Sequence, residues 1–320
     1  MADFVICRLF QILKITESWK KKSISPQAVA ALQKTSEYLS VGHYSPQTSR
    51  NYLGELRYLF VYYADVDPTD FSEDQIFQYL LYLAKTLCCS RVKCALAGQS
   101  IAFFLRYVQQ RPYLIPSMIY PRKTSKLPPI MSPEEIKCLF DTIKNLKHRC
   151  VLMMLYSTGM RISEVANCKI ADIDSKIMRV KVVQGKGAKD RFTILSQAVL
   201  LELRAYYIIY KPTVYLFNGS KAGEKYSLRS IQHLMQKALL NIGLADKNYT
   251  VHTIRHSFAT HLVDNGVDLH TVKELMGHSS LQTTMRYLHL TAKRMDGVVN
   301  PYDVLPAGAD THPAGFKTKN

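Results

Sequence analysis

The segment HTIRHSFATH, residues 252–261, gathers three histidines and one arginine within a single short stretch. On a helix, His252, Arg255 and His256 would lie one turn apart, at positions i, i+3 and i+4. A zinc helix of the HExxH type needs two histidines at i and i+4, with a glutamate after the first. His256 and His261 are instead separated by five positions with no acid near them, which disfavours a zinc protease. For these two histidines we expect packing or hydrogen bonding only.

The charge balance points to a polyanionic partner. The chain has 320 residues and is 47% hydrophobic, which is typical of a globular protein with one large or two ordinary domains. Its 42 lysines and arginines stand against 25 aspartates and glutamates, giving a net charge of +17. The excess is spread along both halves, so nucleic acid wrapped by the whole protein is the leading explanation.

Compartment and membrane contact can also be predicted. No run of 18 apolar residues occurs, and the first residues lack the pattern of a signal peptide, so we expect no membrane partner. Seven cysteines, an odd number without a CxxC pair, indicate reduced and mostly buried thiols. These features predict a cytoplasmic protein with no disulfides and no metal site.

The first 125 residues predict an all-helical domain. Apolar residues recur at helical spacing over 26–40, 45–65, 72–87 and 91–109. Ser45 followed by Pro46 is typical of a helix start, and SEDQ at 72–75 is a capping box. Residues 110–130 then carry five prolines and several lysines and arginines, which predicts an extended basic linker between two domains.

Residues 131–298 predict a second domain that is mostly α with a small β-sheet. Ser132 and Pro133 begin a helix, and CVLMMLYSTG, residues 150–159, predicts a buried helix ending near Gly159. Alternation on both sides of GKGAK within 177–195 predicts a β-hairpin. Further helices are expected at 199–209, 227–241, 252–264, 268–276 and 280–290. Residues 299–320 lack periodicity and predict a flexible tail.

Three further motifs accompany HTIR in a fixed order. They are GMRISE at 159–164, QGKGAKDR at 184–191 and LMGHSSLQTTMRYLH at 275–289. The series resembles the tyrosine recombinase (phage integrase) family, including its Xer-like members, strongly over the last 170 or so residues. The N-terminal helices are similar to the family's core-binding domain, with weaker motifs. Carried over by this resemblance, the catalytic residues are Arg161, Lys186, His252, Arg255, His278 and Tyr287.

The resemblance implies covalent catalysis by Tyr287. A phenolate can attack phosphorus and later be displaced by the hydroxyl of another strand, but the phenol, with an ordinary pKa of about 10, needs activation. Arg161 and Arg255 would clamp the nonbridging oxygens through bidentate hydrogen bonds. Glu164 could orient Arg161 or be ordinary helix surface, and the sequence leaves both open.

The remaining family roles concern proton transfer. Lys186, on the hairpin turn, would protonate the leaving 5′ oxygen, with Lys189 as the competing candidate. His252 would be the base or a proton relay, and His278 would donate to a phosphate oxygen. Positioned cations make a metal or other cofactor unnecessary. Outside this group, basic or hydroxyl residues near two helix starts and in the hairpin are candidate DNA contacts: Ser45, Thr48, Arg50, Lys189, Ser227 and Arg229.

These expectations together describe a two-domain site-specific recombinase or integrase. The resemblance implies cutting and rejoining of double-stranded DNA sites by a homotetramer, through a 3′-phosphotyrosyl intermediate and a Holliday junction. Three alternatives stay open at this point: relaxation of supercoils, as by a type IB topoisomerase, DNA binding without cleavage by a regulator, and a basic structural protein.

Overall fold

A computed structural model describes residues 22–111, 128–183, 190–221 and 223–288. The chain divides into two compact units, Met1–Ser125 and Lys126–Asn320. Lys186, Lys189, the middle of the expected linker and the expected tail at 299–320 lie outside the described residues.

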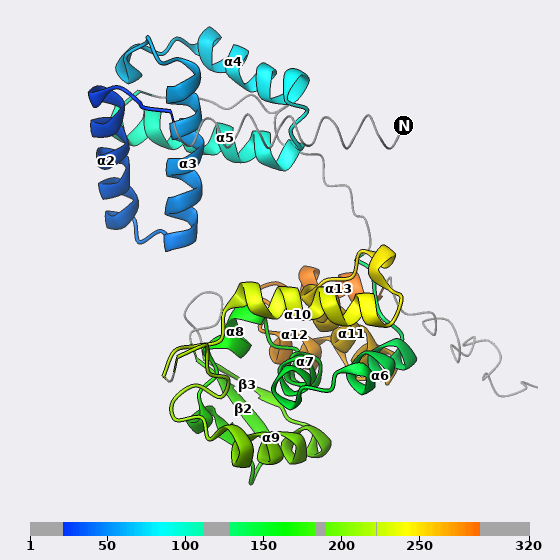
Figure 1. The fold of residues 1–320 in the computed structure, drawn as a ribbon. Coiled ribbons are helices and arrows are strands. Elements are labelled where there is room, and N and C mark those ends of the chain that lie inside the picture. Colours follow the sequence, from blue (N-terminus) through cyan, green and yellow to red (C-terminus); the bar gives the residue numbers. More distant parts are fainter. Residues whose placement is uncertain (1–21, 112–127, 184–189, 222, 289–320) are drawn as a thin grey trace, which may run out of the picture. The chain divides into compact units, whose positions relative to one another are not determined.

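Within its described residues, the N-terminal unit consists of helices joined by loops, with no strand (Figure 1). Its α-helices are α2 (Pro26–Val41), α3 (Pro46–Tyr62), α4 (Glu73–Leu81) and α5 (Arg91–Phe103). A 3-10 turn, η1 (Pro68–Asp70), precedes α4, and the π-helical turns η2 (Tyr82–Thr86) and η3 (Phe104–Val108) extend α4 and α5.

Serine side chains fix where these helices begin. Ser25, Ser45, Ser72 and Ser90 each accept a hydrogen bond from a backbone N–H in the first turn, which satisfies one of the unpaired donors there. Behind these caps, the apolar faces pack into one core, which includes Leu56, Leu59, Ile76, Leu83 and Ile101. The expected helix starts at residues 46 and 73 agree with the structure.

The C-terminal unit surrounds a small sheet with helices (Figure 1). Its helices are α6 (Pro133–Thr142), α7 (Leu146–Thr158), α8 (Ile162–Asn167), α9 (Gln197–Tyr210), α10 (Leu228–Asn241), α11 (Val251–Asp264), α12 (Leu269–Met276) and α13 (Leu281–Leu288), with 3-10 turns η5 (Ile170–Asp172) and η6 (Ala245–Lys247). Its strands are β1 (Ile173–Asp174), β2 (Arg179–Val182) and β3 (Arg191–Ile194).

The sheet is antiparallel, in the order β1-β2-β3. Val180 of β2 lies opposite Thr193 of β3, and both side chains are buried. The hairpin formed by β2 and β3 agrees with the sequence prediction, whereas β1 was missed because a two-residue strand is too short to show alternation. The described residues are mostly helical and form one three-stranded sheet, which confirms the expected fold class.

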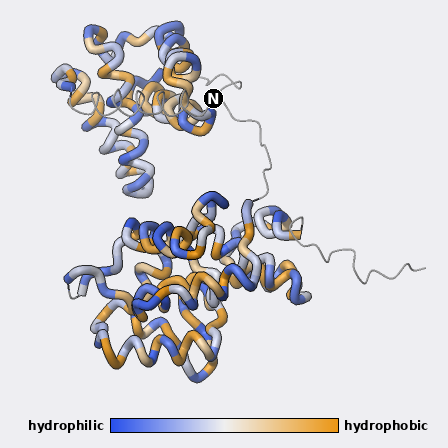
Figure 2. The backbone as a smooth tube through the Cα atoms, turned by 45° about the vertical axis from the view of Figure 1, so that its right-hand side comes forward, coloured by the Kyte–Doolittle hydropathy of each residue, from blue (hydrophilic) through white to orange (hydrophobic). Residues whose placement is uncertain are grey.

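Helix α7 lies at the centre of the second core. Cys150, Val151, Leu152, Met154 and Leu155 are all buried, so almost every side of this helix meets other elements, as its uniformly apolar sequence predicted. Figure 2 shows hydrophobic residues recurring along the helices of each unit, interrupted by hydrophilic ones. Burial of α7 fixes the turn that follows it, and that turn carries the first arginine of the candidate site.

The described cysteines are less buried than the sequence predicted. The prediction of mostly buried cysteines was wrong for half of the described ones: Cys94, Cys150 and Cys168 are buried, but Cys88 and Cys138 are exposed and Cys89 is intermediate. All six are free thiols. Within the described residues, no helix combines the length and apolarity needed to cross a membrane.

Candidate active site

A cavity of ≈300 Å³ opens where α8, α11 and α13 meet the turn between α12 and α13. The volume lies at the lower end of the range for ligand pockets. Three arginines, three histidines and one tyrosine dominate its wall, and among the described residues no carboxylate lines it. The described lining residues are Pro128, Arg161, His252, Arg255, His256, Gly277, His278, Ser279, Thr283, Arg286 and Tyr287.

Gly159 adopts a left-handed backbone conformation, and the turn it forms places Arg161 at the cavity. Gly159 ends α7 with φ +60°, and a Cβ there would come within 2.3 Å of the Phe258 ring, so both conformation and space require glycine. The chain then turns so that Arg161 caps α8, its backbone N–H donating to Glu164 Oε2 at 2.8 Å. The Arg161 guanidinium donates to Glu164 Oε1, also at 2.8 Å.

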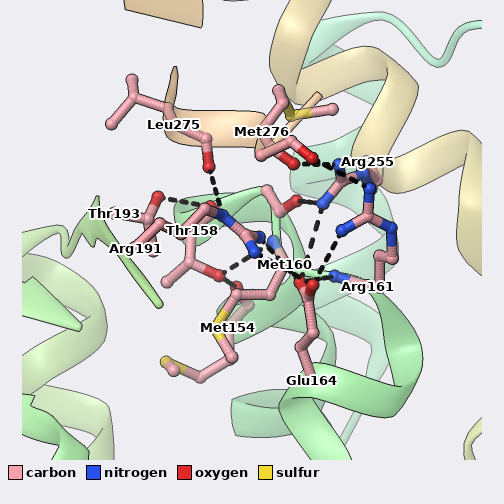
Figure 3. A network of polar contacts seen from close by, with 12 residues as sticks. Met154, Thr158, Met160, Arg161, Glu164, Arg191, Thr193, Arg255, Leu275 and Met276 are labelled. Atoms are coloured by element: carbon pink, nitrogen blue, oxygen red, sulfur yellow. Dashed lines mark hydrogen bonds and ion pairs between the residues drawn. The ribbon is translucent and has the colours of Figure 1, made fainter. Parts of the chain in front are cut away.

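Glu164 is the common anchor of three arginines (Figure 3). Besides the hydrogen bonds from Arg161, the carboxylate accepts a bidentate pair from Arg191, with Nη1 3.0 Å from Oε1 and Nη2 2.7 Å from Oε2. Arg255 Nη1 lies 3.8 Å from Oε2. Burial by itself raises the pKa of Glu164, but the hydrogen bonds from Arg191 and Arg161 outweigh it and lower the pKa to about 2. The carboxylate is therefore charged and held on several sides.

Arg255 is buried with 5% of its surface exposed. Its two terminal nitrogens donate to the carbonyl oxygens of Gly159 and Met276, which join the end of α7 to the end of α12. Burial, reinforced by the nearby Arg161, lowers the pKa of Arg255 to about 10, so the guanidinium stays charged at neutral pH. A buried cation with one shared carboxylate favours an anionic ligand beside it.

The turn after α12 brings His278 beside the arginines. Gly277 has φ +62°, and a Cβ on it would lie 2.8 Å from the Arg191 side chain, so this close approach also requires glycine. Arg191 Nε donates to Leu275 O at 3.0 Å, and Arg161 Nη2 donates to Gly277 O at 3.3 Å. These bonds fix the end of α12 directly before His278.

Tyr287 closes the cavity from α13 with only 3% of its surface exposed. Its hydroxyl lies 3.0 Å from His256 Nδ1, and its ring stacks on His278 with 16° between the planes. Burial raises the pKa of the phenol, while Arg255, Arg286 and Arg161 oppose that shift. The buried hydroxyl is thus neutral at rest, yet it sits in a field that favours the phenolate.

The histidines of the cavity are neutral at physiological pH. Burial, with help from Arg255 and other cations, lowers the pKa of both His256 and His278 to about 4. His278 Nδ1 bonds to Thr284 Oγ1 at 2.9 Å. The pKa of His252, which is only partly buried, is also lowered, first by desolvation and then by Arg255 and Arg161. The cavity therefore combines fixed positive charge, neutral rings able to exchange protons and one phenol, a set suited to displacement at an anionic phosphorus centre.

Family models match most of the chain. Residues 129–294 match the model described as the phage integrase family, and residues 31–115 match its N-terminal SAM-like domain. Tyrosine recombinase XerC of Staphylococcus saprophyticus is 31% identical over 79% of this chain and 89% of its own length. A tyrosine recombinase of Pseudothermotoga lettingae is 30% identical over 84% of this chain and 96% of its own. The chain belongs to the phage integrase family, the tyrosine recombinases.

Solved structures share the fold. The crystal structure of XerH site-specific recombinase bound to its difH substrate aligns with a TM-score of 0.64 at 19% identity, covering 86% of this chain and 95% of that one. The Tn1549 transposon integrase in complex with circular intermediate DNA aligns with a TM-score of 0.61 at 17% identity, covering 83% and 95%.

Five of the six expected catalytic residues of this tyrosine recombinase line the cavity, and their chemical roles stay a prediction. They are Arg161, His252, Arg255, His278 and Tyr287. Lys186 and its competitor Lys189 lie outside the described residues. Of the two readings left open for Glu164, the structure supports the one in which it orients Arg161.

The expected DNA contacts lie elsewhere in the two units. Ser45 caps α3 and shares a 2.8 Å hydrogen bond with Thr48, while Arg50 donates to Gln47 from an exposed position. Ser227 and Arg229, at the start of α10, are exposed. None of these residues lines the cavity, and their role in binding DNA stays a prediction.

Sequence reasoning missed two participants. Arg191 was predicted only as a strand residue, although its guanidinium donates hydrogen bonds to Glu164 and to the carbonyl of Leu275 near the end of α12. His256 was expected to pack or hydrogen-bond without a role, and it does hydrogen-bond, but its partner is Tyr287. The signal available for His256 was its place one residue after Arg255, on the same turn of the helix. No local signal marked Arg191, because its partners lie 27 and 84 residues away.

Proposed function

We propose that this tyrosine recombinase cuts and rejoins double-stranded DNA at specific sites through a covalent bond between Tyr287 and a 3′ phosphate. One observation carries the proposal: Tyr287, whose hydroxyl lies 3.0 Å from His256 Nδ1, lines the same cavity as Arg161, Arg255, His252 and His278. A scissile phosphodiester in that cavity would meet a nucleophile and two guanidiniums together.

The arginines would bind the nonbridging oxygens. A guanidinium has five N–H donors. The described hydrogen bonds use two donors on Arg161 and two on Arg255, which leaves donors on each for a phosphate. Because Glu164 holds Arg161 in place before DNA arrives, little reorganisation is needed when negative charge builds up in the transition state.

Proton transfer completes the proposed cleavage. The Tyr287 oxygen bonds to phosphorus and loses its proton to a neighbouring base, while the bond to the 5′ oxygen breaks and that oxygen takes a proton from Lys186. His278 donates to a phosphate oxygen in this scheme, and His252 serves as a base or relay. Attack by the 5′ hydroxyl of another strand reverses the chemistry and releases the tyrosine.

Strand exchange between two sites would need several protomers. We propose a homotetramer on two DNA sites, acting through a Holliday junction in the cytoplasm. The relatives with solved structures support the DNA substrate, since XerH is described as bound to difH and lambda integrase as a dimer bound to a core site. Ser45, Thr48, Arg50, Ser227, Arg229 and Lys189 are the proposed contacts to that DNA.

The test uses nicked suicide duplexes tiled across the DNA that flanks the chain's own gene. Incubation followed by a denaturing gel should show a covalent protein–DNA adduct with the wild-type protein and none with Tyr287→Phe. Arg161→Ala should still bind DNA but cleave far less. An adduct that persists in Tyr287→Phe would remove this residue from the mechanism. Religation only within one duplex, never between two, would favour topoisomerase-like relaxation.

A further inference from the structure

The tyrosine of the cavity has one described hydrogen-bond partner on its hydroxyl, the imidazole of His256. The Tyr287 oxygen and His256 Nδ1 are 3.0 Å apart, and the two ring centroids are 5.8 Å apart. This is the distance at which a proton can pass directly between two groups. Both residues line the cavity, so the pair is part of the surface that would meet the phosphate.

The other histidines of the cavity are placed differently. His278 stacks its ring on the Tyr287 ring, with centroids 6.1 Å apart, and its Nδ1 is bonded to Thr284. His252 occupies the exposed start of α11, one turn before His256. In the described part of the chain, neither makes a hydrogen bond to the tyrosine hydroxyl. Geometry alone therefore selects His256 as the group within reach of the phenolic proton.

The charge state of His256 fits this position. It is faced by His252 and Arg255 on its own helix and by Arg286 on α13. Together with burial, which is the largest cause, these groups lower its pKa to about 4. A neutral imidazole with its proton on Nε2 offers the Nδ1 lone pair to the tyrosine. A phosphodiester anion entering the cavity would partly offset the cations, and would raise the pKa of His256 at the moment when it needs to accept a proton.

We propose that His256 is a catalytic residue that accepts the phenolic proton of Tyr287 during cleavage and returns it during religation. The O–H bond of Tyr287 breaks and an Nδ1–H bond forms as the phenolic oxygen bonds to phosphorus. The electron pair of the broken P–O bond leaves on the 5′ oxygen, which is protonated by a separate acid. In religation, His256 protonates the departing phenolate. This assignment rests on the proposed recombinase function.

The same helix supplies a matched control. His261 pairs with Tyr156 through Nδ1 and the tyrosine hydroxyl at 2.8 Å, and neither residue lines the cavity. It therefore has the same ring, the same kind of partner and a similar burial on α11, without access to the proposed phosphate site. If breaking a histidine–tyrosine hydrogen bond of this helix were enough to slow DNA cleavage, His261→Asn should slow it equally.

The first measurement is the single-turnover rate of adduct formation on a suicide duplex that the wild-type protein cleaves. His256→Asn keeps an acceptor near the position of Nδ1 but cannot take up a proton, and His256→Ala removes both. We expect both variants to bind the duplex normally and to cleave it at least about 100-fold more slowly, the usual scale for loss of a positioned base. His261→Asn should stay within about twofold of wild type. Normal cleavage by His256→Asn would overturn the proposal, because a hydrogen bond would then be sufficient.

The second measurement separates proton transfer from folding. In a Tyr287→Phe background, a duplex end carrying a 3′-(p-nitrophenyl) phosphate can be joined to a 5′ hydroxyl strand. Its leaving group is much more acidic than tyrosine, so it departs without a proton. We expect His256→Asn to join this substrate at the rate of its His256 parent. If His256→Asn lowered the rate equally on the suicide duplex and on the p-nitrophenyl phosphate substrate, the role of His256 would be structural and the proposal would be overturned. No adduct from the wild-type protein on any duplex would instead overturn the recombinase function itself.

Discussion

Two buried glutamates, one in each unit of the chain, have equally hidden side chains and opposite electrostatics. Glu164 and Glu55 are each 7% exposed. The pKa of Glu164 is lowered to about 2, whereas burial raises the pKa of Glu55 and the hydrogen bond from Lys93 offsets this only in part. Burial alone therefore does not decide whether a carboxylate keeps its charge.

The difference lies in the donors around each group. Glu164 accepts hydrogen bonds on both oxygens from Arg161 and Arg191. Glu55 bonds to Lys93 through Oε1, while its Oε2 is buried without a described partner. Hydrogen bonds to both oxygens offset the free energy of desolvating a carboxylate and hold it in one orientation. Hydrogen bonds to only one oxygen do not. Only a carboxylate held through both oxygens can act as a template for the arginines of an active site.

The largest expected effect comes from removing the charge of Glu164. In Glu164→Gln, the fork from Arg191 and the bond from Arg161 lose their anionic acceptor, so Arg161 should lose its fixed orientation. We expect DNA cleavage to fall by about 100-fold or more, the scale of losing one preorganised electrostatic contact. The measurement is single-turnover adduct formation. Cleavage within a few-fold of wild type would show that Arg161 needs no template.

The second expected effect is on stability in acid. Because the pKa of Glu164 is lowered on folding, its contribution is present above its ordinary pKa of 4.5 and is lost as the pH falls toward about 2. The shift corresponds to about 3 kcal/mol when fully lost. Hydrogen exchange of the α8 amides, followed by mass spectrometry at falling pH, should show this loss in the wild-type protein.

Two controls sharpen the acid experiment. Glu164→Gln should show a flatter profile over that pH range, since the titrating group is gone. Glu55 has the opposite sign: its raised pKa makes the folded state favour the protonated form, so any contribution is present at low pH and is lost as the pH rises. Amides of α3, which carries Glu55, should therefore not show the acid loss attributed to Glu164. An identical acid loss in both helices would contradict the comparison.

A smaller effect is expected at the arginine that anchors Glu164. Arg191→Lys keeps the charge but loses the planar fork and the Nε bond to Leu275 O. The loss of one hydrogen bond to a charged group, about 1.5 kcal/mol, corresponds to about tenfold slower cleavage. Arg179→Lys, on the neighbouring strand and exposed, is the matched control and should cleave normally. Equal rates for the two variants would show that the fork is dispensable.

The smallest effect is expected at Glu55. Its charge is disfavoured in the folded state, and the Lys93 side chain is 32% exposed, so the ammonium can be rehydrated when its partner is neutral. Glu55→Gln should therefore change the opening free energy of α3, measured by hydrogen exchange, by less than about 1 kcal/mol. If Glu55→Gln lowered the opening free energy of α3 as much as Glu164→Gln lowers that of α8, the Glu55–Lys93 pair would stabilise its helix as strongly as the arginines around Glu164 stabilise theirs.

The sequence predicted those parts of the fold that depend on local chemistry. Capping residues such as Ser72 and Ser132 fixed helix starts, and Gly159 marked the end of a buried helix. Five catalytic candidates were carried over from the resemblance of the ordered motifs to a known family, and they meet at one cavity. Local patterns did not reveal β1, which exists only because β2 lies beside it.

The supporting contacts were harder to predict for a physical reason. The partners of Arg191 depend on how β3, α8 and α12 pack, and the hydrogen bond of His256 depends on where α13 returns along α11. A sequence shows which side chains can donate or accept, but only the packed fold selects the partner. Residues that act by holding other residues are therefore the part of a site least visible in its motifs.

Covalent catalysis by Tyr287 can be tested by identifying the residue that carries DNA after cleavage. The adduct trapped on a suicide duplex would be digested with nuclease and protease, and the nucleotide-bearing peptide sequenced by mass spectrometry. We expect a 3′-phosphonucleotide on the hydroxyl of Tyr287. A nucleotide attached to another side chain, or to the 5′ end of the cut strand, would contradict it.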